Sequence, residues 1–190
     1  YDDITFFKGA NVFKNFHTYL GPELFFKGLK NLFKNNNGGT INYEKFKESY
    51  QNLSNEREYK LDPIKYIEPF ILKSGINQVE CFYELENETI SKCYIQQTSN
   101  KIMHIHNDYN YITDICVIGA DDNETIFKDV KIFNNEISEL KGIKKPKSII
   151  LNINDTSYFV QKFSATELEY LMNTYIKKSV RNFYLEIIIT

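Results

Sequence analysis

The sequence predicts an α+β fold in which a helical region precedes a small β-sandwich and the start of a second helical region. Three observations support this prediction. Apolar residues recur at spacings of three and four over the first third of the chain, which is typical of amphipathic helices. After Asn77 the apolar period changes to two, which is typical of strands. At Ser164-Ala165-Thr166-Glu167 a capping box marks the start of another helix.

Four helices are predicted before Asn77. The apolar face of the first is predicted to consist of Phe6, Ala10, Phe13, Phe16, Tyr19 and Leu20, and that of the second of Leu24, Phe25, Leu29, Leu32 and Phe33. Gly21-Pro22 ends the first helix and begins the second, because proline is well tolerated in a first turn. The Asn- and Gly-rich segment 35–39 is a loop.

The third and fourth helices begin at recognisable N-caps. Asn42 caps the third helix, and Asp62 followed by Pro63 opens the fourth. The residues expected to be buried are Phe46, Tyr50 and Leu53 in the third helix, and Tyr66, Phe70 and Leu72 in the fourth. Ser74-Gly75 is expected to close the fourth helix with a terminal glycine.

The region after Asn77 contains six short segments with strand character. They are 79–85, 89–97, 111–119, 125–133, 148–153 and 158–163, and the first two are expected to form a hairpin. Segment 148–153 is apolar almost without a break, so we expect it to be covered on both faces. Short strands at roughly even spacing favour a small sandwich.

Composition excludes several classes of partner. The formal net charge is −2, so the chain has no overall field that would attract nucleic acid or acidic lipid. No apolar run reaches the roughly 18 residues that a membrane span requires, so no membrane segment is expected in this chain. The chain begins at Tyr1 without an initiator Met or a signal sequence, and we expect it to be an excised or truncated piece.

The three cysteines leave two alternatives open. Cys81 and Cys93 flank a predicted turn at 86–88 and would face each other across two strands if the turn centres on Asn87, which would permit a disulfide. The alternative is three reduced, half-buried thiols in a cytosolic protein, because the sequence has no Cys-x-x-Cys. This alternative predicts a cytoplasmic location.

The segment Phe6-Phe7-Lys8-Gly9-Ala10 resembles the "Tyr-x-Lys-Gly-Ala" segment of the zinc aminopeptidases that include puromycin-sensitive and membrane alanyl aminopeptidase. In that family the Tyr hydroxyl donates a hydrogen bond to the oxyanion formed when zinc-bound water attacks the first peptide bond. The resemblance implies that Phe6 occupies the position of this catalytic Tyr without its donor. Losing one oxyanion donor typically costs roughly 10²–10³ in turnover.

Further motifs follow in the family's order. Residues 20–29 are similar to its "Leu-Gly-x-x-x-Phe-x-x-Gly-Leu" segment, and residues 38–42 to its "Gly-Asn-x-Thr" loop. Residues 62–77 resemble its "Asp-Leu-x-x-Trp-x-x-x-Trp-x-x-x-x-Gly-x-Asn" helix, with Tyr66 and Phe70 at the Trp positions. Residues 145–155 resemble a strand of the bacterial-type members.

The resemblance implies a domain organisation. Residues 1–76 would be the C-terminal helical part (the distal half) of a thermolysin-like catalytic domain. Residues 77–163 would be the β-sandwich domain, and residues 164–190 the start of a C-terminal helical domain.

Two functional motifs of the family do not occur in this sequence: the zinc-binding His-Glu-x-x-His and the amine-binding Gly-x-Met-Glu-Asn loop. We therefore expect a fragment of a peptide-cleaving aminopeptidase that has zinc only in the full-length protein, while this chain binds no metal and is inactive. Two alternatives remain. One is a degenerate family member that acts as a peptide-binding or scaffold protein, which Phe6 favours. The other is an unrelated α+β binding module.

Other candidate sites are weaker. His104 and His106 would share one face of a strand, with Asp108 as the only nearby third ligand, so an exposed strand edge is the preferred interpretation. His17 is interpreted as a boundary residue of the first helix. Ser164 lacks a nucleophile elbow and is a helix cap, and segment 36–39 lacks the Gly-Lys-Ser/Thr ending of a phosphate-binding loop. The lysines of segment 141–147 are interpreted as a solvated loop, with an anionic partner as the alternative.

Overall fold

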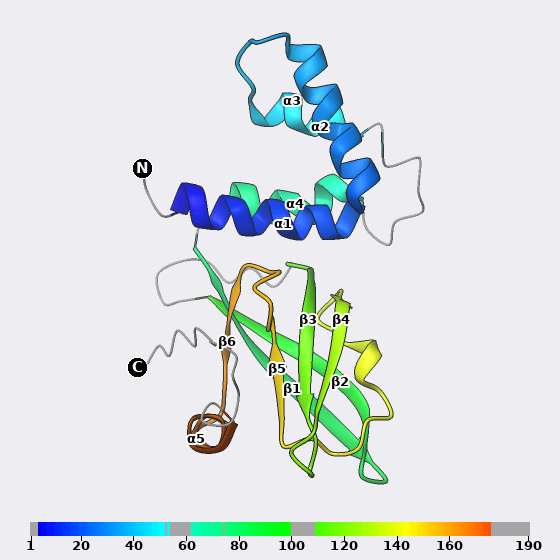
Figure 1. The fold of residues 1–190 in the computed structure, drawn as a ribbon, viewed down its shortest axis with the longest axis vertical. Helices are drawn as coiled ribbons and strands as arrows, with labels where there is room; N and C mark the ends of the chain where they lie inside the picture. Colours follow the sequence, from blue (N-terminus) through cyan, green and yellow to red (C-terminus); the bar gives the residue numbers. More distant parts are fainter. Residues whose placement is uncertain (1–3, 52, 54–61, 74, 100–108, 176–190) are drawn as a thin grey trace. The chain divides into compact units, whose positions relative to one another are not determined.

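The computed structural model describes residues 4–51, 53, 62–73, 75–99 and 109–175 (Figure 1). The chain divides into two compact units, 1–74 and 75–190, each of which is described by itself. The first contains helices and the second contains two three-stranded sheets followed by a helix, so the predicted α+β class is confirmed. The assignment of these units to particular peptidase domains stays a prediction.

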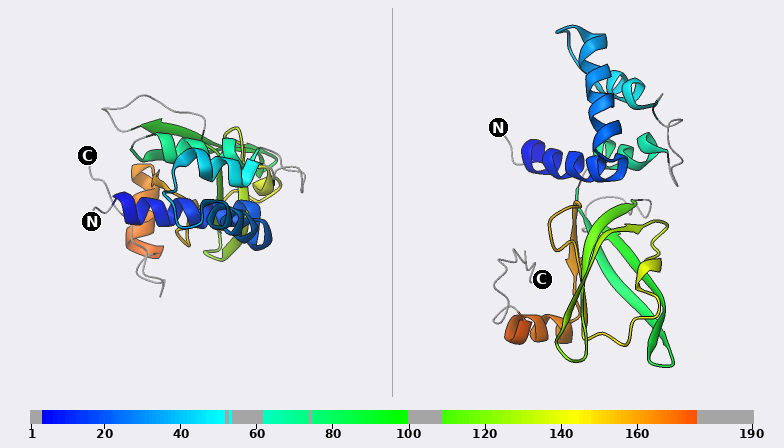
Figure 2. Two further views of the ribbon diagram at one scale, coloured as in Figure 1. Left: turned by 90° about the horizontal axis from the view of Figure 1, so that it is seen from above. Right: turned by 45° about the vertical axis from the view of Figure 1, so that its right-hand side comes forward.

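The helical unit contains a short π-helix and four α-helices. Their bounds are η1 Ile4–Lys8, α1 Gly9–Leu20, α2 Pro22–Asn36, α3 Tyr43–Gln51 and α4 Pro63–Leu72. Helices α1 and α4 lie side by side, while α2 turns away from them and packs on α3 (Figures 1 and 2). The four helices are those that the sequence predicts, and η1 was not expected.

Local capping signals explain where two of the helices begin. The Asn42 Oδ1 accepts a hydrogen bond from the Lys45 N–H at 3.0 Å, and the Asp62 Oδ1 accepts from the Ile64 N–H at 2.9 Å. Both side chains satisfy donors that the first helical turn leaves without partners. The end of α4 differs from the prediction, because Lys73 already adopts an extended conformation and Gly75, with a φ of 85°, lies beyond the helix.

The core of the helical unit is aromatic. Its central side chains, all buried, are Phe16, Phe25, Phe46, Tyr50, Tyr66 and Phe70. The prediction that Ala10, Phe13, Phe33 and Leu72 belong to buried faces is wrong, since all four are exposed. Each helix buries only the side that meets its neighbour, and in α1 this side contains the polar Asn15 between Val12 and Phe16. Apolar spacing alone could not place a buried asparagine on that face.

The second unit is a small β-sandwich. Its strands are β1 Asn77–Glu86, β2 Thr89–Ser99, β3 Tyr111–Ile118, β4 Glu124–Ile132, β5 Ser148–Leu151 and β6 Phe159–Lys162. One sheet has the order β2-β1-β6 and the other β4-β3-β5. All neighbouring strands are antiparallel except β1 and β6, which run parallel. All six predicted strands are present, with shifted ends.

The hairpin between β1 and β2 turns at Asn87 and Glu88, whose φ angles of 49° and 63° are those of a tight two-residue hairpin turn. A bulge follows Glu84, so Cys81 pairs with Ile95, and Cys93 with Tyr83. The condition for a direct pairing of Cys81 with Cys93, a turn centred on Asn87, is therefore not met, and the two cysteines are offset by two positions. None of the three cysteines forms a disulfide, since all three lie within the described residues as thiols.

The sandwich core lies around β3 and β5, in which every residue is buried, as predicted for the apolar segment that begins at Ser148. Strand β5 ends before the predicted residue 153, because Asn152 has a positive φ of 58°. After β6, Ser164 caps α5 (Ala165–Tyr170), which continues as a π-turn, η4 (Leu171–Tyr175). Leu171 and Tyr170 pack on Cys116 and Ile150 of the second sheet, so the predicted helix after Ser164 is confirmed and covers this sheet.

Candidate functional site

The candidate catalytic position, Phe6, lies on the surface of the helical unit. Its side chain is 56% exposed and that of its neighbour Phe7 is 68% exposed. The prediction that Phe6 belongs to the buried apolar face of the first helix is wrong. The reason is η1, whose turn follows an i→i+5 pattern, so the α-helical spacing of three and four no longer predicts which side chains share a face. Single π-turns of this kind are frequent at functional sites.

Lys8, at the end of η1, connects this turn to the C-terminal end of α4. Its Nζ donates a hydrogen bond to the carbonyl oxygen of Lys73 at 2.8 Å. Lys73 is the C-cap of α4, where carbonyl groups lack helical donors and the helix dipole favours a positive charge. Burial lowers the pKa of the Lys8 ammonium below its usual range. Lys8 therefore joins the start of α1 to the end of α4 and holds the turn that carries Phe6.

Any side chain at Gly28 of α2 would collide with the ring of Tyr50. A β-carbon on Gly28 would lie 2.1 Å from the nearest ring atom of Tyr50, which is completely buried. The Tyr50 hydroxyl donates to the carbonyl oxygen of Phe25 at 2.9 Å, one turn earlier on α2. Because the side chain of glycine is a single hydrogen, α2 and α3 can approach each other with the Tyr50 ring between them. Gly28, the second glycine of the segment 20–29, therefore has a packing role.

The aromatic residues of the segment 62–77 form part of the core. The ring of Tyr66 stacks on that of Tyr19, with centroids 4.0 Å apart and planes 10° apart, and its hydroxyl donates to Asn15 Oδ1. Phe70 lies one turn further along α4, with its ring centroid 6.1 Å from that of Tyr66. These contacts hold α4 against α1, and so they support the Lys8–Lys73 contact at the end of α4.

The histidines give no metal centre among the described residues. His17 is half-buried and makes edge-to-face contacts with Phe25 and Phe26, with ring centroids at 5.0 Å and 5.8 Å, as expected of a boundary residue. His104 and His106 lie outside the described residues. Within the part of the chain that the structure describes, no group of three His, Cys, Asp or Glu side chains could hold an ion.

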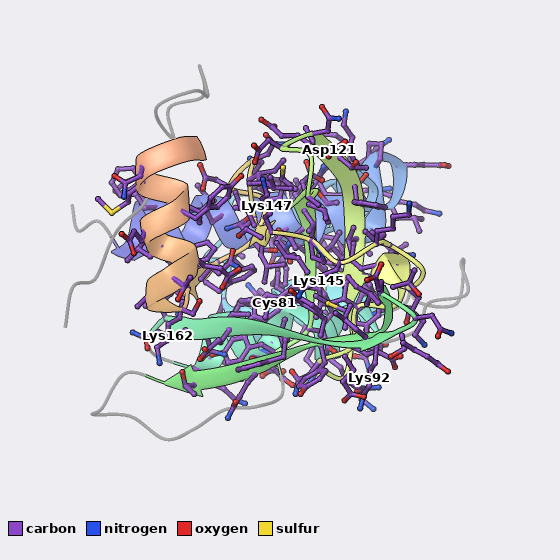
Figure 3. All side chains as sticks on the ribbon, turned by 90° about the horizontal axis from the view of Figure 1, so that it is seen from below. Cys81, Lys92, Asp121, Lys145, Lys147 and Lys162 are labelled. Atoms are coloured by element: carbon purple, nitrogen blue, oxygen red, sulfur yellow. The ribbon has the colours of Figure 1, made fainter. Side chains whose placement is uncertain are left out.

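The remaining candidates have structural roles. The Ser164 Oγ accepts a hydrogen bond from the Glu167 N–H at 3.3 Å, which is the predicted cap. In the basic segment 141–147, Lys141 forms an ion pair with Glu136 at 3.3 Å. Lys145, which is labelled in Figure 3, is exposed.

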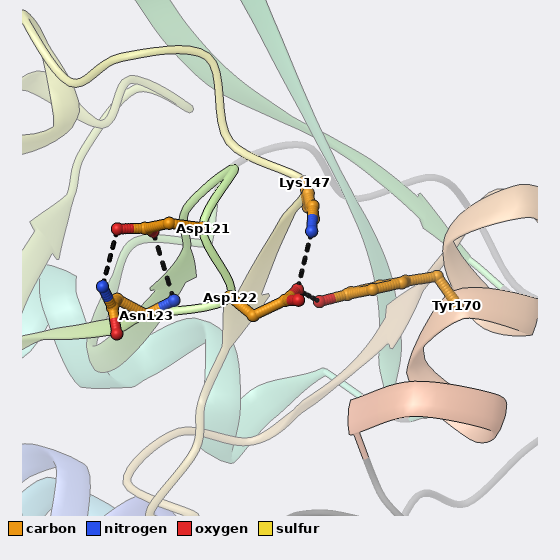
Figure 4. A network of polar contacts seen from close by, with 5 residues as sticks. All are labelled: Asp121, Asp122, Asn123, Lys147 and Tyr170. Carbon is orange, nitrogen blue, oxygen red and sulfur yellow. Dashed lines mark hydrogen bonds and ion pairs between the residues drawn. The ribbon is translucent and has the colours of Figure 1, made fainter.

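Lys147 belongs to a contact between the second sheet and α5. Its Nζ contacts the Asp122 Oδ1 at 2.8 Å, and the same oxygen accepts from the Tyr170 hydroxyl at 2.6 Å (Figure 4). Burial, then the hydrogen bond and charge of Asp122, raise the pKa of Tyr170 to about 12. This lysine therefore takes part in docking α5, and the prediction that the whole segment is only solvated is incomplete.

Residues 1–70 match the family model described as the peptidase family M1 domain. The match covers the segments that carry Phe6, Lys8, Gly28 and Tyr66, and it supports a relationship of the helical unit to the M1 aminopeptidase family. It extends over the helical unit alone, so the β-sandwich is outside it. No curated protein matches the chain.

No helix among the described residues is both long enough and apolar enough to span a membrane.

Proposed function

We propose that this chain is part of a zinc aminopeptidase of the M1 family, similar to the puromycin-sensitive and membrane alanyl enzymes, which removes N-terminal residues from peptides. Residues 1–76 would form the distal helical part of the catalytic domain. Residues 77–163 would form the β-sandwich domain of the enzyme, and residues 164–190 would form the start of a C-terminal helical domain. The match of residues 1–70 to the M1 domain carries this proposal.

The geometry around Phe6 supports its assignment to the active site. A residue in the core would be unable to contact a substrate, whereas the Phe6 ring is exposed on a π-turn that Lys8 anchors. A tyrosine at this position would extend its hydroxyl from an exposed ring into the space beside the turn. Phenylalanine keeps the ring and its apolar contact area but cannot donate to an oxyanion. Phe6 would therefore help to define the substrate site while leaving part of the developing negative charge without a hydrogen bond.

Zinc would be held by residues outside this chain, because the His-Glu-x-x-His motif does not occur in the sequence. The metal would supply the activated water that attacks the peptide bond. The chain's own contribution would be the surface around η1 and the rigid support of that surface by α1 and α4.

The alternative, a degenerate member that binds peptides without cleaving them, is favoured by one observation. Phe6 and Phe7 present two adjacent exposed rings and no hydroxyl, a combination suited to binding apolar side chains. In this alternative the protein would still bind peptides but would not hydrolyse them.

The test compares the chain alone with the chain extended through the sequence that precedes Tyr1. The proposal predicts no stoichiometric zinc and no hydrolysis of aminoacyl-anilides for the chain alone, and one zinc per extended chain with measurable hydrolysis. An extended protein that binds peptides without zinc or hydrolysis would establish the degenerate alternative. An extended protein that neither binds zinc nor peptides would contradict both.

A further inference from the structure

Two thiols lie close together in the first sheet of the sandwich. Cys81 in β1 and Cys93 in β2 have their Sγ atoms 3.7 Å apart. In the register of the hairpin they are diagonal neighbours, since Cys81 pairs with Ile95 and Cys93 pairs with Tyr83. Residues two apart on a strand point to the same face, so both thiols lie on one side of the sheet. The bulge after Glu84 increases the local twist, and the short sulfur separation shows that the two side chains converge.

The two thiols differ in accessibility. Cys93 is completely buried, whereas Cys81, which is labelled in Figure 3, is partly exposed. The third thiol, Cys116, lies in β3 of the other sheet, is completely buried, and has Glu124 Oε2 at 3.9 Å. An oxidant that approaches from solvent would therefore meet Cys81 first, and Cys93 is the thiol in position to react next.

We propose that Cys81 and Cys93 form a reversible dithiol site, which low-molecular-weight disulfides such as oxidised glutathione convert to an intramolecular disulfide that joins β1 to β2. In the first step the Cys81 thiolate attacks one sulfur of oxidised glutathione. A mixed disulfide forms on Cys81, and one glutathione leaves as thiolate. In the second step the Cys93 thiolate attacks the Cys81 Sγ and releases the second glutathione. The two protein thiols are oxidised by two electrons, one glutathione disulfide is reduced, and the two thiol protons end on the released glutathiones.

The second step requires only a small movement of the two sulfur atoms. The sulfur separation of 3.7 Å must decrease to about 2.0 Å, a change that side-chain rotation can supply across strands that are already paired. The bond would close the hairpin loop that contains the Asn87–Glu88 turn. Because the bond restrains the unfolded chain, the oxidised sandwich should unfold at a higher temperature than the reduced one.

The surroundings of Cys81 set the conditions for the reaction. The hydrogen bond with Cys93, burial, and the negative charge of Glu167 on α5 all raise the pKa of the Cys81 thiol. Burial, then the charge of Glu167 and the two thiols, raise the pKa of Tyr83. Since the thiolate is the attacking species, oxidation should be slow near neutral pH and faster as the pH rises.

Thiol counting and peptide mapping test the proposal on the whole chain. After treatment with oxidised glutathione, the number of thiols titrated under denaturing conditions should fall from three to one. Trypsin cleaves after Lys73, Lys92 and Lys101, so the disulfide should link peptide 74–92 to peptide 93–101, and reduction should separate them. Cys116→Ser is the matched control and should leave this linked pair unchanged. Cys93→Ser should stop at the mixed disulfide on Cys81.

Four outcomes would overturn the proposal. The first three are retention of all three thiols, a linked pair that contains the Cys116 peptide 102–128, and a disulfide between two chains. A stable mixed disulfide on wild-type Cys81 would also overturn it, because Cys93 would then have failed to complete the exchange. The wild-type peptide map decides the matter even if a serine variant does not fold.

Discussion

Replacement of Gly28 by alanine tests the packing on which the helical unit depends. In a helix without tertiary contacts this change is stabilising by about 1 kcal/mol. Alanine has the higher helix propensity, and it makes the unfolded chain less flexible than glycine does. In this structure the new β-carbon would meet three ring atoms of Tyr50 at 2.1–2.5 Å, whereas ordinary contact begins at 3.4 Å. Either the Tyr50 ring or one of the two helices must therefore move by more than an ångström.

The expected cost follows from this overlap. Overpacking a well-filled core costs about 1–3 kcal/mol. Displacement of the ring would also break the hydrogen bond from the Tyr50 hydroxyl to the Phe25 carbonyl oxygen, a loss of about 1 kcal/mol. After subtraction of the helix-propensity gain, Gly28→Ala should destabilise the helical unit by about 1–3 kcal/mol.

Hydrogen exchange of the α2 and α3 amides is the appropriate assay, because it reports on the helical unit even if the two units unfold separately. Gly9→Ala is the matched control, since a β-carbon at Gly9 meets nothing within 4 Å and should give a small gain in stability. In a Tyr50→Ala background the ring is gone, so Gly28→Ala should change from destabilising to stabilising. If Gly28→Ala protects these amides as well as Gly9→Ala does, the close packing of α2 on α3 is refuted.

Three further predictions concern caps, a buried network and pH. Asp62→Ala should destabilise the first turn of α4 by about 1 kcal/mol, as measured by hydrogen exchange of the amides in that turn. Asp62→Asn should destabilise the turn much less, because asparagine is also a good N-cap. Gln97 is buried and bonds to Asn77 at 2.8 Å and to the Tyr109 carbonyl at 2.8 Å, so Gln97→Leu should lower the stability of the sandwich by about 2–4 kcal/mol in thermal unfolding. The same change at exposed Gln96 should have an effect within about 0.5 kcal/mol. Tyr170 has a pKa raised from 10.0 to about 12, so its contribution to α5 docking is complete below pH 10 and is lost as the pH rises from 10 towards 12. Asp122→Asn should shift the tyrosinate absorbance transition of Tyr170 to lower pH.

The features that could be predicted from the sequence are those that depend on neighbouring residues. The caps at Asn42, Asp62 and Ser164 each act on donors two or three positions away, so the sequence contains all the necessary information. The strands were predictable for the same reason, because alternation is a local pattern.

The features that could not be predicted depend on partners that are distant in the sequence. Asn15 is buried because its side chain accepts from Tyr66, 51 residues later, and Lys8 bonds to a carbonyl 65 residues later. The parallel pairing of β1 with β6 is equally distant. At the candidate site, the exposure of Phe6 follows from a single π-turn that periodicity does not detect. The sequence could place Phe6 in a motif, and only the structure shows that its ring reaches the surface.

The central claim is that Phe6 stands where a tyrosine hydroxyl would stabilise the oxyanion. The most direct measurement compares Phe6→Tyr with Phe7→Tyr in a protein that carries this chain together with the proposed zinc-binding part of the catalytic domain. Both rings are exposed and adjacent, so either hydroxyl is accommodated without burial, and the Phe7 variant is the matched control.

Because the new hydrogen bond would form only as negative charge develops, Phe6→Tyr should raise kcat by roughly 10²-fold or more while KM changes little. Phe7→Tyr should leave both constants close to those of the unmodified protein. Equal turnover of the Phe6→Tyr variant and the unmodified, active protein would contradict the account, as would an equal gain from Phe7→Tyr.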